Sequence, residues 1–301
     1  MSYSAKILAD SVSPVGHRLT TFEVTFPRIV LAEWNTHRVF SRNSASSRAI
    51  PSSKIIERVV ENPFIPIYWG KNQKGMQANE ELSDAARRSA EDTWLSIREV
   101  AVGAVRLLVN NLNLHKQIAN RLLEPFLWHT VIVTATEWSN FFNLRDNEKA
   151  QPEIRFAAHM MRELYDNSKP ERLNVGDWHL PLSPENEKTE FSTEIRVRLS
   201  AARCARVSYL THEGKRDPED DLRLYTDLLT NGHMSPLEHP ARPMTMHEIA
   251  LFGKEEVQWD SSINKWALTG RRKFFCGNFD GWIQHRKLIP GEADILGTRA
   301  T

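Results

Sequence analysis

Residues 21–48 read TFEVTFPRIVLAEWNTHRVFSRNSASSR, and the two halves of this stretch predict different structures. The first half, 21–34, mixes β-branched and aromatic residues around Pro27, which indicates a strand that is broken or bulged at the proline. The second half, 35–48, holds one His, three Arg, four Ser and two Asn without a carboxylate. Guanidinium groups bind phosphate bidentately and hydroxyls add neutral donors, so this half indicates an anion-binding loop. A solvated basic loop is the alternative, because neither a Gly-rich nor a Walker-type phosphate loop accompanies it.

The rest of the chain has the composition of a globular protein, with 41% hydrophobic and 26% charged residues among 301. A net charge of +1 gives no general attraction to nucleic acid or lipid, so we expect no nucleic-acid partner. The first residues lack an apolar signal core, and no window approaches ~18 uninterrupted apolar residues, so we expect no membrane association. Two cysteines in so long a chain are typical of a reducing compartment, and we expect a cytoplasmic protein.

Helix dominates the periodicity outside the opening stretch. Apolar residues at three- and four-residue steps predict one helix over 78–110, a second over 115–123, and a third with Pro152 in its first turn. Residues 166–190 are polar and turn-rich, which predicts a connector or long surface loop. Asp217 is a natural N-cap for a later helix. Together with the strand region, this pattern predicts an α+β fold, which we take as a single domain over 1–301.

The segment GHMSPLEHP, 232–240, is a second candidate site. His233, Glu238 and His239 are possible metal ligands, but their spacing differs from H-E-x-x-H and no Cys pair accompanies them. A capped helix end followed by a turn is an equally good explanation. We therefore expect no metal.

Two arginines and two cysteines are weaker candidates. Arg121 and Arg145 lie within or at the end of apolar segments, where an arginine usually reaches solvent or pairs with a carboxylate, although two of them could meet an anionic substrate. Cys204 follows Arg203, and a nearby guanidinium can lower a thiol pKa, but neither Cys204 nor Cys276 has a histidine partner in sequence. Both are expected to be buried fillers, and a cysteine nucleophile is not predicted.

Placed together, these segments resemble the flavin-dependent thymidylate synthases, the ThyX family. The signature of that family is R-H-R, seven residues, then S-x-R, and the residues that fit it and its neighbours are His37, Arg38, Ser41, Asn43, Ser46 and Arg48. NFFNLRDNEKAQPEIR, 140–155, is similar to the flavin and substrate helix of the family. SAARCARVSYL, 200–210, and LLTNGHMSPLEH, 228–239, are similar to its N-terminal region. The resemblance covers about half of the chain.

The order and some residues depart from the family pattern. The segments similar to the N-terminal region lie about 160 residues after the signature rather than before it, so we expect a circularly permuted arrangement. Thr36 stands where the first Arg of R-H-R is expected, and Ser44 where the family often has an acidic residue. The tail WIQHRKLIPGE, 282–292, repeats an H-R element; it is either a degenerate duplicate or a chance similarity, and Arg286 or Glu292 could replace the lost contacts.

The resemblance implies a helix-rich ThyX-like fold with a small antiparallel sheet, and reductive methylation of dUMP at C5. The co-substrates would be methylenetetrahydrofolate and NAD(P)H, the cofactor FAD, and the assembly a homotetramer with shared active sites. The implied catalytic residues are Arg145 and Ser46. The implied substrate-binding residues are Glu33, Ser44, Ser46, Ser47, Arg48, Arg121 and Arg145. The implied cofactor-binding residues are Thr36, His37, Arg38, Val39, Asn43, Asn140, His233, Ser235 and Glu238.

Three other functions stay open at this point. A related flavin-dependent enzyme could add a methyl or hydroxymethyl group at C5 of dUMP, dCMP or UMP, because Thr36 and Ser44 alter the loop that would contact the substrate. A non-catalytic nucleotide- or nucleic-acid-binding protein could use the same basic loop. A metal-dependent hydrolase would use His233 and His239. The sequence distinguishes neither NADH from NADPH nor one oligomeric state from another.

Overall fold

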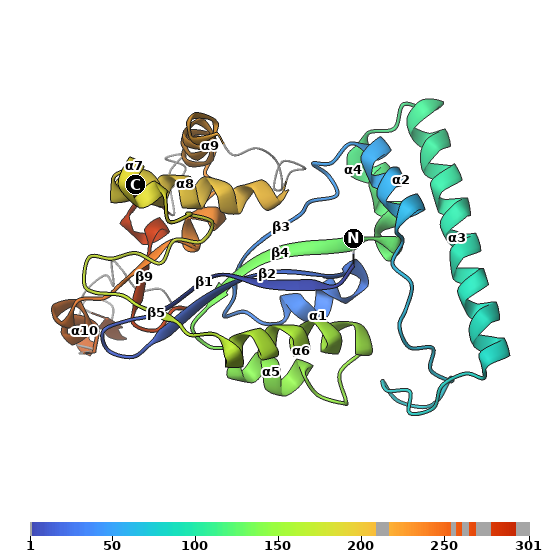
Figure 1. The fold of residues 1–301 in the computed structure, drawn as a ribbon, viewed down its shortest axis with the longest axis horizontal. Helices are drawn as coiled ribbons and strands as arrows, with labels where there is room; N and C mark the ends of the chain where they lie inside the picture. Colours follow the sequence, from blue (N-terminus) through green and yellow to red (C-terminus); the bar gives the residue numbers. More distant parts are fainter. Residues whose placement is uncertain (1, 209–216, 254–256, 261–264, 269–277, 293–301) are drawn as a thin grey trace.

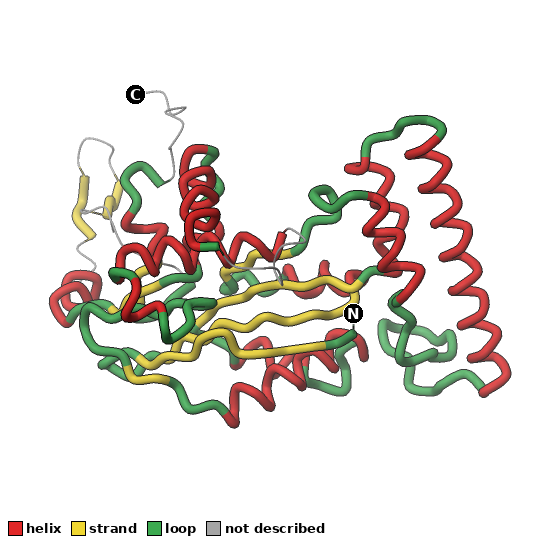
Figure 2. Tube along the Cα trace, turned by 45° about the horizontal axis from the view of Figure 1, so that its top comes forward, coloured by secondary structure: helices red, strands yellow, loops and turns green. Residues whose placement is uncertain are grey.

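The structure, a computed structural model, describes residues 2–208, 217–253, 257–260, 265–268 and 278–292. A five-stranded sheet in the order β3-β4-β2-β1-β5 lies at its centre (Figures 1 and 2). Its strands are β1 (Ser4–Val12), β2 (Arg18–Pro27), β3 (Ser41–Ser44), β4 (Trp128–Ala135) and β5 (Glu171–Arg172). All neighbouring strands of this sheet are antiparallel except β5, which runs parallel to β1. Two small antiparallel pairs consist of β6 (Ala241–Pro243) with β9 (Trp282–Gln284) and β7 (Val257–Asp260) with β8 (Lys265–Leu268).

Helices surround the sheet, and the mixture confirms the α+β class. The α-helices are α1 (Leu31–Asn35), α2 (Ser52–Glu61), α3 (Asp84–Asn110), α4 (Lys116–Ala119), α5 (Ser139–Arg145), α6 (Pro152–Asn167), α7 (Glu187–Glu190), α8 (Thr193–Ala205), α9 (Pro218–Thr230) and α10 (Met246–Gly253). The 3₁₀ turns are η1 (Arg28–Val30), η2 (Asn120–Phe126), η3 (Arg206–Ser208), η4 (Ser235–Glu238) and η5 (His285–Leu288). Within the described ranges, no helix combines the length and apolar character needed to cross a membrane.

The central sheet buries both faces, and the alternation of its side chains explains how. Phe22, Val24 and Phe26 of β2 pack with β4 residues against Ile154 and Met161 of α6. On the opposite face, Ile132 of β4 packs against Cys204 of α8, Val207 of η3 and Leu182, which precedes α7. Figure 1 shows α5 and α6 along one side of the sheet and α8 and α9 along the other. A strand covered on one face only would have left this second set of residues exposed.

Two further clusters define the ends of the molecule. At one end α2, α3 and η2 bury an apolar group that includes Val59, Val105 and Leu123. At the other end Leu19, at the start of β2, shares a cluster with Ala241, Phe279 and Trp282. The C-terminal part of the described chain is therefore packed onto the turn between β1 and β2.

Several predicted elements are confirmed and others differ. The strand does break at Pro27, but the chain after it forms η1 and α1 rather than a second piece of strand. The helix predicted over 78–110 begins at Asp84, because the hydroxyl of Ser83 accepts a hydrogen bond from the backbone N–H of Ala86 and caps it. Pro152 opens α6 and Asp217 caps α9 as predicted.

Two regions were predicted less well. Only four residues of 115–123 form an α-helix, and a 3₁₀ turn that contains Pro125 follows, because proline cannot donate the next α-helical hydrogen bond. Residues 166–190 contain the end of α6, the short strand β5 and α7, and they bury Leu173, His179 and Leu182. This segment therefore is not a surface loop throughout, since it covers one edge of the central sheet.

Candidate functional site

The polar stretch 35–48 follows one edge of the sheet and centres on β3. Ser41 pairs with Thr134 of β4, Ser44 pairs with Val131, and the extended conformation continues to Ala45, whose N–H donates to the carbonyl oxygen of Thr130 (3.0 Å). The strand separates two groups of predicted site residues. One group lies at the end of α1, before β3, and the other lies in the loop after it.

His37 and Arg145 meet at the end of α1. The Arg145 Nε donates to His37 Nε2 (2.9 Å), and its Nη2 donates to the carbonyl oxygen of Glu33 (3.2 Å) and to the Thr36 hydroxyl (3.1 Å). The His37 ring is buried and stacks on Phe40, with a centroid distance of 5.7 Å. Burial, and then the positive charges of Arg145 and Arg42, lower the pKa of His37 to about 4. The ring is therefore neutral at pH 7, with Nε2 as acceptor and Nδ1 carrying the hydrogen.

Two cations of the same stretch lie close enough to repel each other. Burial lowers the pKa of Arg42, the charge of Arg38 lowers it further, and Glu238 acts in the opposite direction. Arg42 Nη1 donates to the side-chain oxygen of Asn35 (3.1 Å), which carries no charge. Positive charge is thus concentrated beside β3.

The segment 235–239 packs directly on β3. The Ser41 hydroxyl donates to Glu238 Oε2 (2.6 Å), although the two residues are 197 positions apart in sequence. The Asn43 side-chain amide lies between the Ser235 hydroxyl (3.2 Å) and His239 Nε2 (3.0 Å), and in its best orientation its N–H donates to His239 while its oxygen accepts from Ser235. The two motifs singled out in the sequence therefore form one site.

Donors converge on a carboxylate in the loop after β3. The Ser47 hydroxyl (2.8 Å) and the guanidinium groups of Arg28 (3.0 Å) and Arg121 (2.6 Å) all contact Glu124 Oε1. Burial by itself would raise the pKa of Glu124, but these donors, Ser47 foremost, hold it below its usual value. The side chain of Asn120 donates to the Ser47 carbonyl oxygen (2.7 Å) and fixes the loop. This arrangement already holds one anionic group.

The other predicted site residues lie nearer the surface. Ser44 and Ser46 are partly buried, on β3 and in the loop after it. Arg38, Val39, Arg48, Asn140 and His233 are exposed, and Asn140 lies on the outer side of α5. Arg145, predicted to contact the pyrimidine, lies at the end of α1, where its Nη2 donates to the carbonyl oxygen of Glu33.

Sequence reasoning gave His239 only as a possible metal ligand, and it missed Asn278 and Gln284 of the tail. His239 is buried, and its Nδ1 contacts the Thr134 hydroxyl (2.8 Å), so both ring nitrogens have partners and burial lowers its pKa to about 3. Asn278 and Gln284 of the tail contact Ser41 (2.8 and 3.0 Å). The repeated H-R element was the one signal that could have pointed to the tail. In the described ranges, no three His, Cys, Asp or Glu side chains are grouped to hold a metal.

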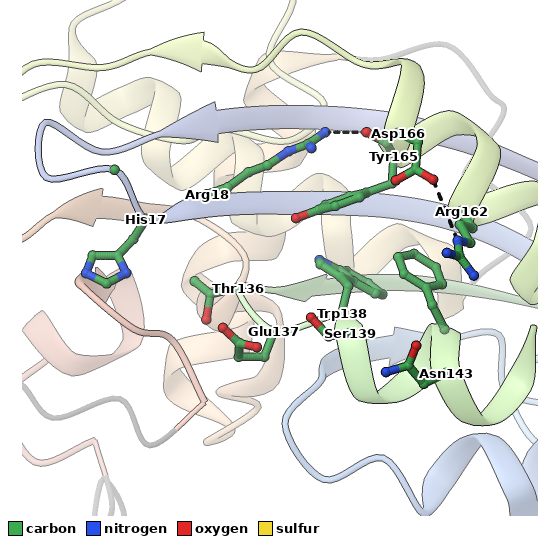
Figure 3. A pocket seen from close by; sticks show the side chains of 12 residues that line it. His17, Arg18, Thr136, Glu137, Trp138, Ser139, Asn143, Arg162, Tyr165 and Asp166 are labelled. Atoms are coloured by element: carbon green, nitrogen blue, oxygen red, sulfur yellow. Dashed lines mark hydrogen bonds and ion pairs between the residues drawn. The ribbon is translucent and has the colours of Figure 1, made fainter.

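A separate pocket of about 450 Å³ lies where the β1–β2 turn meets α5 and α6 (Figure 3). His17, Thr136, Ser139 and Asn143 contribute to its wall, and none of the predicted site residues does. Its arginines are paired with carboxylates, Arg18 with Asp10 (2.7 Å) and Arg162 with Asp166 (3.6 Å). The concentrated positive charge lies beside β3 instead.

This geometry defines a class of protein. It is an α+β protein in which two sequence segments, 35–48 and 233–239, meet at one edge of the central sheet. The family model for thymidylate synthase complementing protein, Thy1, matches residues 5–171, which is more than half of the chain. The chain therefore belongs to the Thy1 (ThyX) family. No curated protein matches the sequence.

Similar solved structures include two enzymes. One is the UMP/dUMP methylase PolB from Streptomyces cacaoi bound with 5-Br dUMP, at 17% identity and a TM-score of 0.45, over 55% of this chain and 90% of that one. The other is thymidylate synthase X from Helicobacter pylori with FAD and dUMP, at 17% identity and a TM-score of 0.35, over 49% and 67%.

Proposed function

We propose that this protein is a flavin-dependent enzyme that methylates dUMP at C5, with methylenetetrahydrofolate as carbon donor and NAD(P)H as reductant. Family membership supports the proposal, and one observation carries it. The signature stretch and the 233–239 segment, far apart in sequence, meet on β3 through Ser41, Asn43, Ser235 and Glu238. A solvated basic loop would not bury Ser41 and Asn43 against a segment 192 to 197 positions away in sequence.

The residues beside β3 fit FAD. A dinucleotide carries a pyrophosphate, and the guanidinium groups of Arg38 and Arg42 provide concentrated positive charge with donors in a fixed fork. Neutral His37 and the Ser235 hydroxyl add uncharged polar groups at the same edge. When bound, FAD would supply the hydride that completes the methyl group. The protein residues would bind and orient the cofactor next to the pyrimidine.

The end of α1 fits the pyrimidine. Glu33 Oε2 is buried and has no hydrogen-bond partner, and a buried acceptor without a donor is costly. A ring N–H could satisfy it, and Arg145, which already contacts the same turn, could face the ring carbonyls and stabilise negative charge that develops there. Ser44 lies on the strand between this end and the phosphate-binding loop.

Ser46 and Arg48 would hold the nucleotide phosphate, and Ser47 and Arg121 would join them by exchanging their contacts with Glu124 for contacts with the phosphate. An extended chain rises about 3.3 Å per residue, so Ser41, at the start of β3, and Ser46, in the loop after it, can be separated by up to about 17 Å. One mononucleotide would not contact both groups easily within a single chain. We therefore propose a site that combines residues of different subunits, as in the homotetramer that the resemblance implies.

Cys204 is consistent with a reaction that needs no protein nucleophile. It is fully buried beside Ile132, Leu182 and Val207, where a thiol cannot reach a substrate. Cys276 lies outside the described residues.

A permuted order within one domain also fits the packing. Ala241, which follows the 233–239 segment, shares a core cluster with Leu19 at the start of β2. In the family order, the 233–239 segment comes before the strand that leads to the signature. A connection from Ala241 to the start of β2 would be short, because the two are in the same cluster.

The test is reconstitution of the purified protein. We expect it to be yellow, to release FAD on denaturation, and to form dTMP from dUMP, methylenetetrahydrofolate and NAD(P)H, with loss of the C5 hydrogen. A product heavier by one oxygen would indicate hydroxymethylation, and substitution of dCMP or UMP would identify the substrate. A colourless protein that binds polynucleotides with a steep salt dependence would contradict the proposal.

A further inference from the structure

The tail segment 278–292 forms part of the site although it lies outside the region that matches the family. Its contacts converge on Ser41, whose hydroxyl is buried. That hydroxyl donates to Glu238 Oε2 (2.6 Å) and accepts from Asn278 Nδ2 (2.8 Å) and Gln284 Nε2 (3.0 Å). The Ser41 hydroxyl thus uses its hydrogen and both lone pairs, and two of its three hydrogen bonds come from the tail.

Arg286 fixes the other oxygen of the same carboxylate. Its Nη1 donates to Glu238 Oε1 (2.6 Å) and its Nε to Glu292 Oε2 (2.6 Å), while Lys287 Nζ contacts Glu292 Oε1 (2.5 Å). Both Glu238 oxygens are therefore occupied, and the carboxylate has one orientation. A charge-assisted pair with a planar guanidinium is the interaction best suited to impose that orientation.

The orientation of Glu238 matters because Ser41, to which it is bonded, directly precedes Arg42 on β3. Arg42 interacts with the charge of Glu238, while its Nη1 donates to the neutral side-chain oxygen of Asn35 (3.1 Å). A carboxylate released from Arg286 could turn toward Arg42 and neutralise it. The positive charge that a pyrophosphate needs would then be lost.

We propose that Arg286 is a positioning residue of the cofactor site: it holds Glu238 in the orientation in which it is bonded to Ser41, and so keeps Arg38 and Arg42 available for the anionic part of the flavin nucleotide. This inference rests on the proposed function. It assigns a role to the tail for which the family signature has no counterpart.

The experiment is titration of the apo protein with FAD, followed by flavin fluorescence. Arg286→Ala is expected to weaken FAD binding by about tenfold, the effect of one charged hydrogen bond. Arg242→Ala is the matched control, because Arg242 forms a similar partly buried pair with Glu248 (2.8 Å) and contacts neither Ser41 nor Glu238. The control is expected to bind FAD as the wild type does.

A double-mutant comparison separates positioning from general structural damage. In a Glu238→Gln background, Arg286→Ala is expected to change FAD affinity by less than about twofold, because the residue through which it acts is no longer charged. Additive losses would overturn the proposal. Arg286→Lys keeps the charge and should recover most of the affinity, which also provides a folded variant if Arg286→Ala is unstable.

The two possible failures are distinguishable. A wild-type protein that does not bind FAD contradicts the proposed function itself. A wild-type protein that binds FAD, together with folded Arg286→Ala and Arg286→Lys variants that bind it equally well, contradicts only the role of Arg286.

Discussion

Arg145 is the residue on which the proposed chemistry depends most. Its three hydrogen bonds place it on the end of α1, with His37 held neutral beneath it. Thr36 makes this arrangement possible, since a hydroxyl accepts from a guanidinium where a second arginine would repel it. The departure at position 36 from the family signature therefore has a local physical consequence.

We predict that Arg145→Ala loses turnover by a factor on the order of 10²–10³, as when an oxyanion donor is removed, while the protein still folds. Steady-state kinetics of the reconstituted enzyme measure the first effect and circular dichroism the second. Retained turnover would remove Arg145 from the mechanism.

At the scale of elements, a buried chain of polar side chains joins the sheet to the segments that cover it. Ser11 contacts His179 Nδ1 (2.9 Å), His179 Nε2 contacts the Thr21 hydroxyl (2.7 Å), and Thr21 contacts Thr134 (2.7 Å). Thr134 then reaches His239, as described above. These hydrogen bonds hold His179 against β2 and His239 against β4. They therefore fix the position of the 233–239 segment beside β3.

Thr134→Val should therefore destabilise the protein by about 1–3 kcal/mol, because it removes one of the two hydrogen bonds of the buried Thr21 hydroxyl and leaves His239 Nδ1 without its partner. Urea unfolding measures this. Thr130→Val is the matched control: it breaks a similar pair with Thr25 (2.9 Å) on the same strand, at a less buried position, and should cost less. Equal losses of unfolding free energy in the two variants would contradict a special role for this buried row of hydrogen-bonded side chains.

At the scale of the whole molecule, α3 presents an apolar face. Ile97, Val100 and Leu107 are each more than half exposed and fall on one side of that helix. Exposed apolar surface of this kind is typical of a contact with another protein. It agrees with the proposal that subunits associate and share their sites.

Shared sites predict complementation. Arg48→Ala and Arg145→Ala should each be inactive alone, whereas their coexpression should restore part of the activity, because some sites then receive both intact residues from different subunits. Turnover of the mixed assembly, isolated with two affinity tags, is the measurement. Mixed assemblies without activity would contradict the shared site.

Several histidines make the stability of the whole molecule depend on pH. Burial lowers the pKa of His129, His179 and His239 to about 3, below the ordinary value near 6.5 that they regain on unfolding. The unfolded chain therefore binds more protons between these values. Stability should be highest above about pH 7 and fall as the pH decreases toward 3, by up to about 1.4 kcal/mol per pH unit for each of these histidines.

Urea unfolding at about pH 7.5, 6 and 5 tests this expectation, because these values extend from above the ordinary histidine pKa to below it. His129→Gln should reduce the pH dependence by one proton relative to the wild type. An unfolding free energy that does not change over this range would show that these side chains are not kept neutral in solution.

Local signals in the sequence predicted several of the elements and the anion-binding character of 35–48. Asp217 and Pro152 indicated where α9 and α6 begin, since caps and first-turn prolines act within one turn of helix. The residue types of 35–48 indicated an anion site for a similar reason, because hydroxyl and guanidinium chemistry belongs to the side chains themselves. The strand β1 gave no comparable signal and was missed.

The pairing of segments was decided by the tertiary structure alone. Ser41 meets Glu238 and Gln284 across 197 and 243 positions, and Arg286 closes the same cluster. Periodicity constrains a residue only relative to its neighbours along one helix or strand, so it carries no information about partners at such separations. Burial selects those partners, because polar groups removed from water must find donors and acceptors wherever the folded chain brings them.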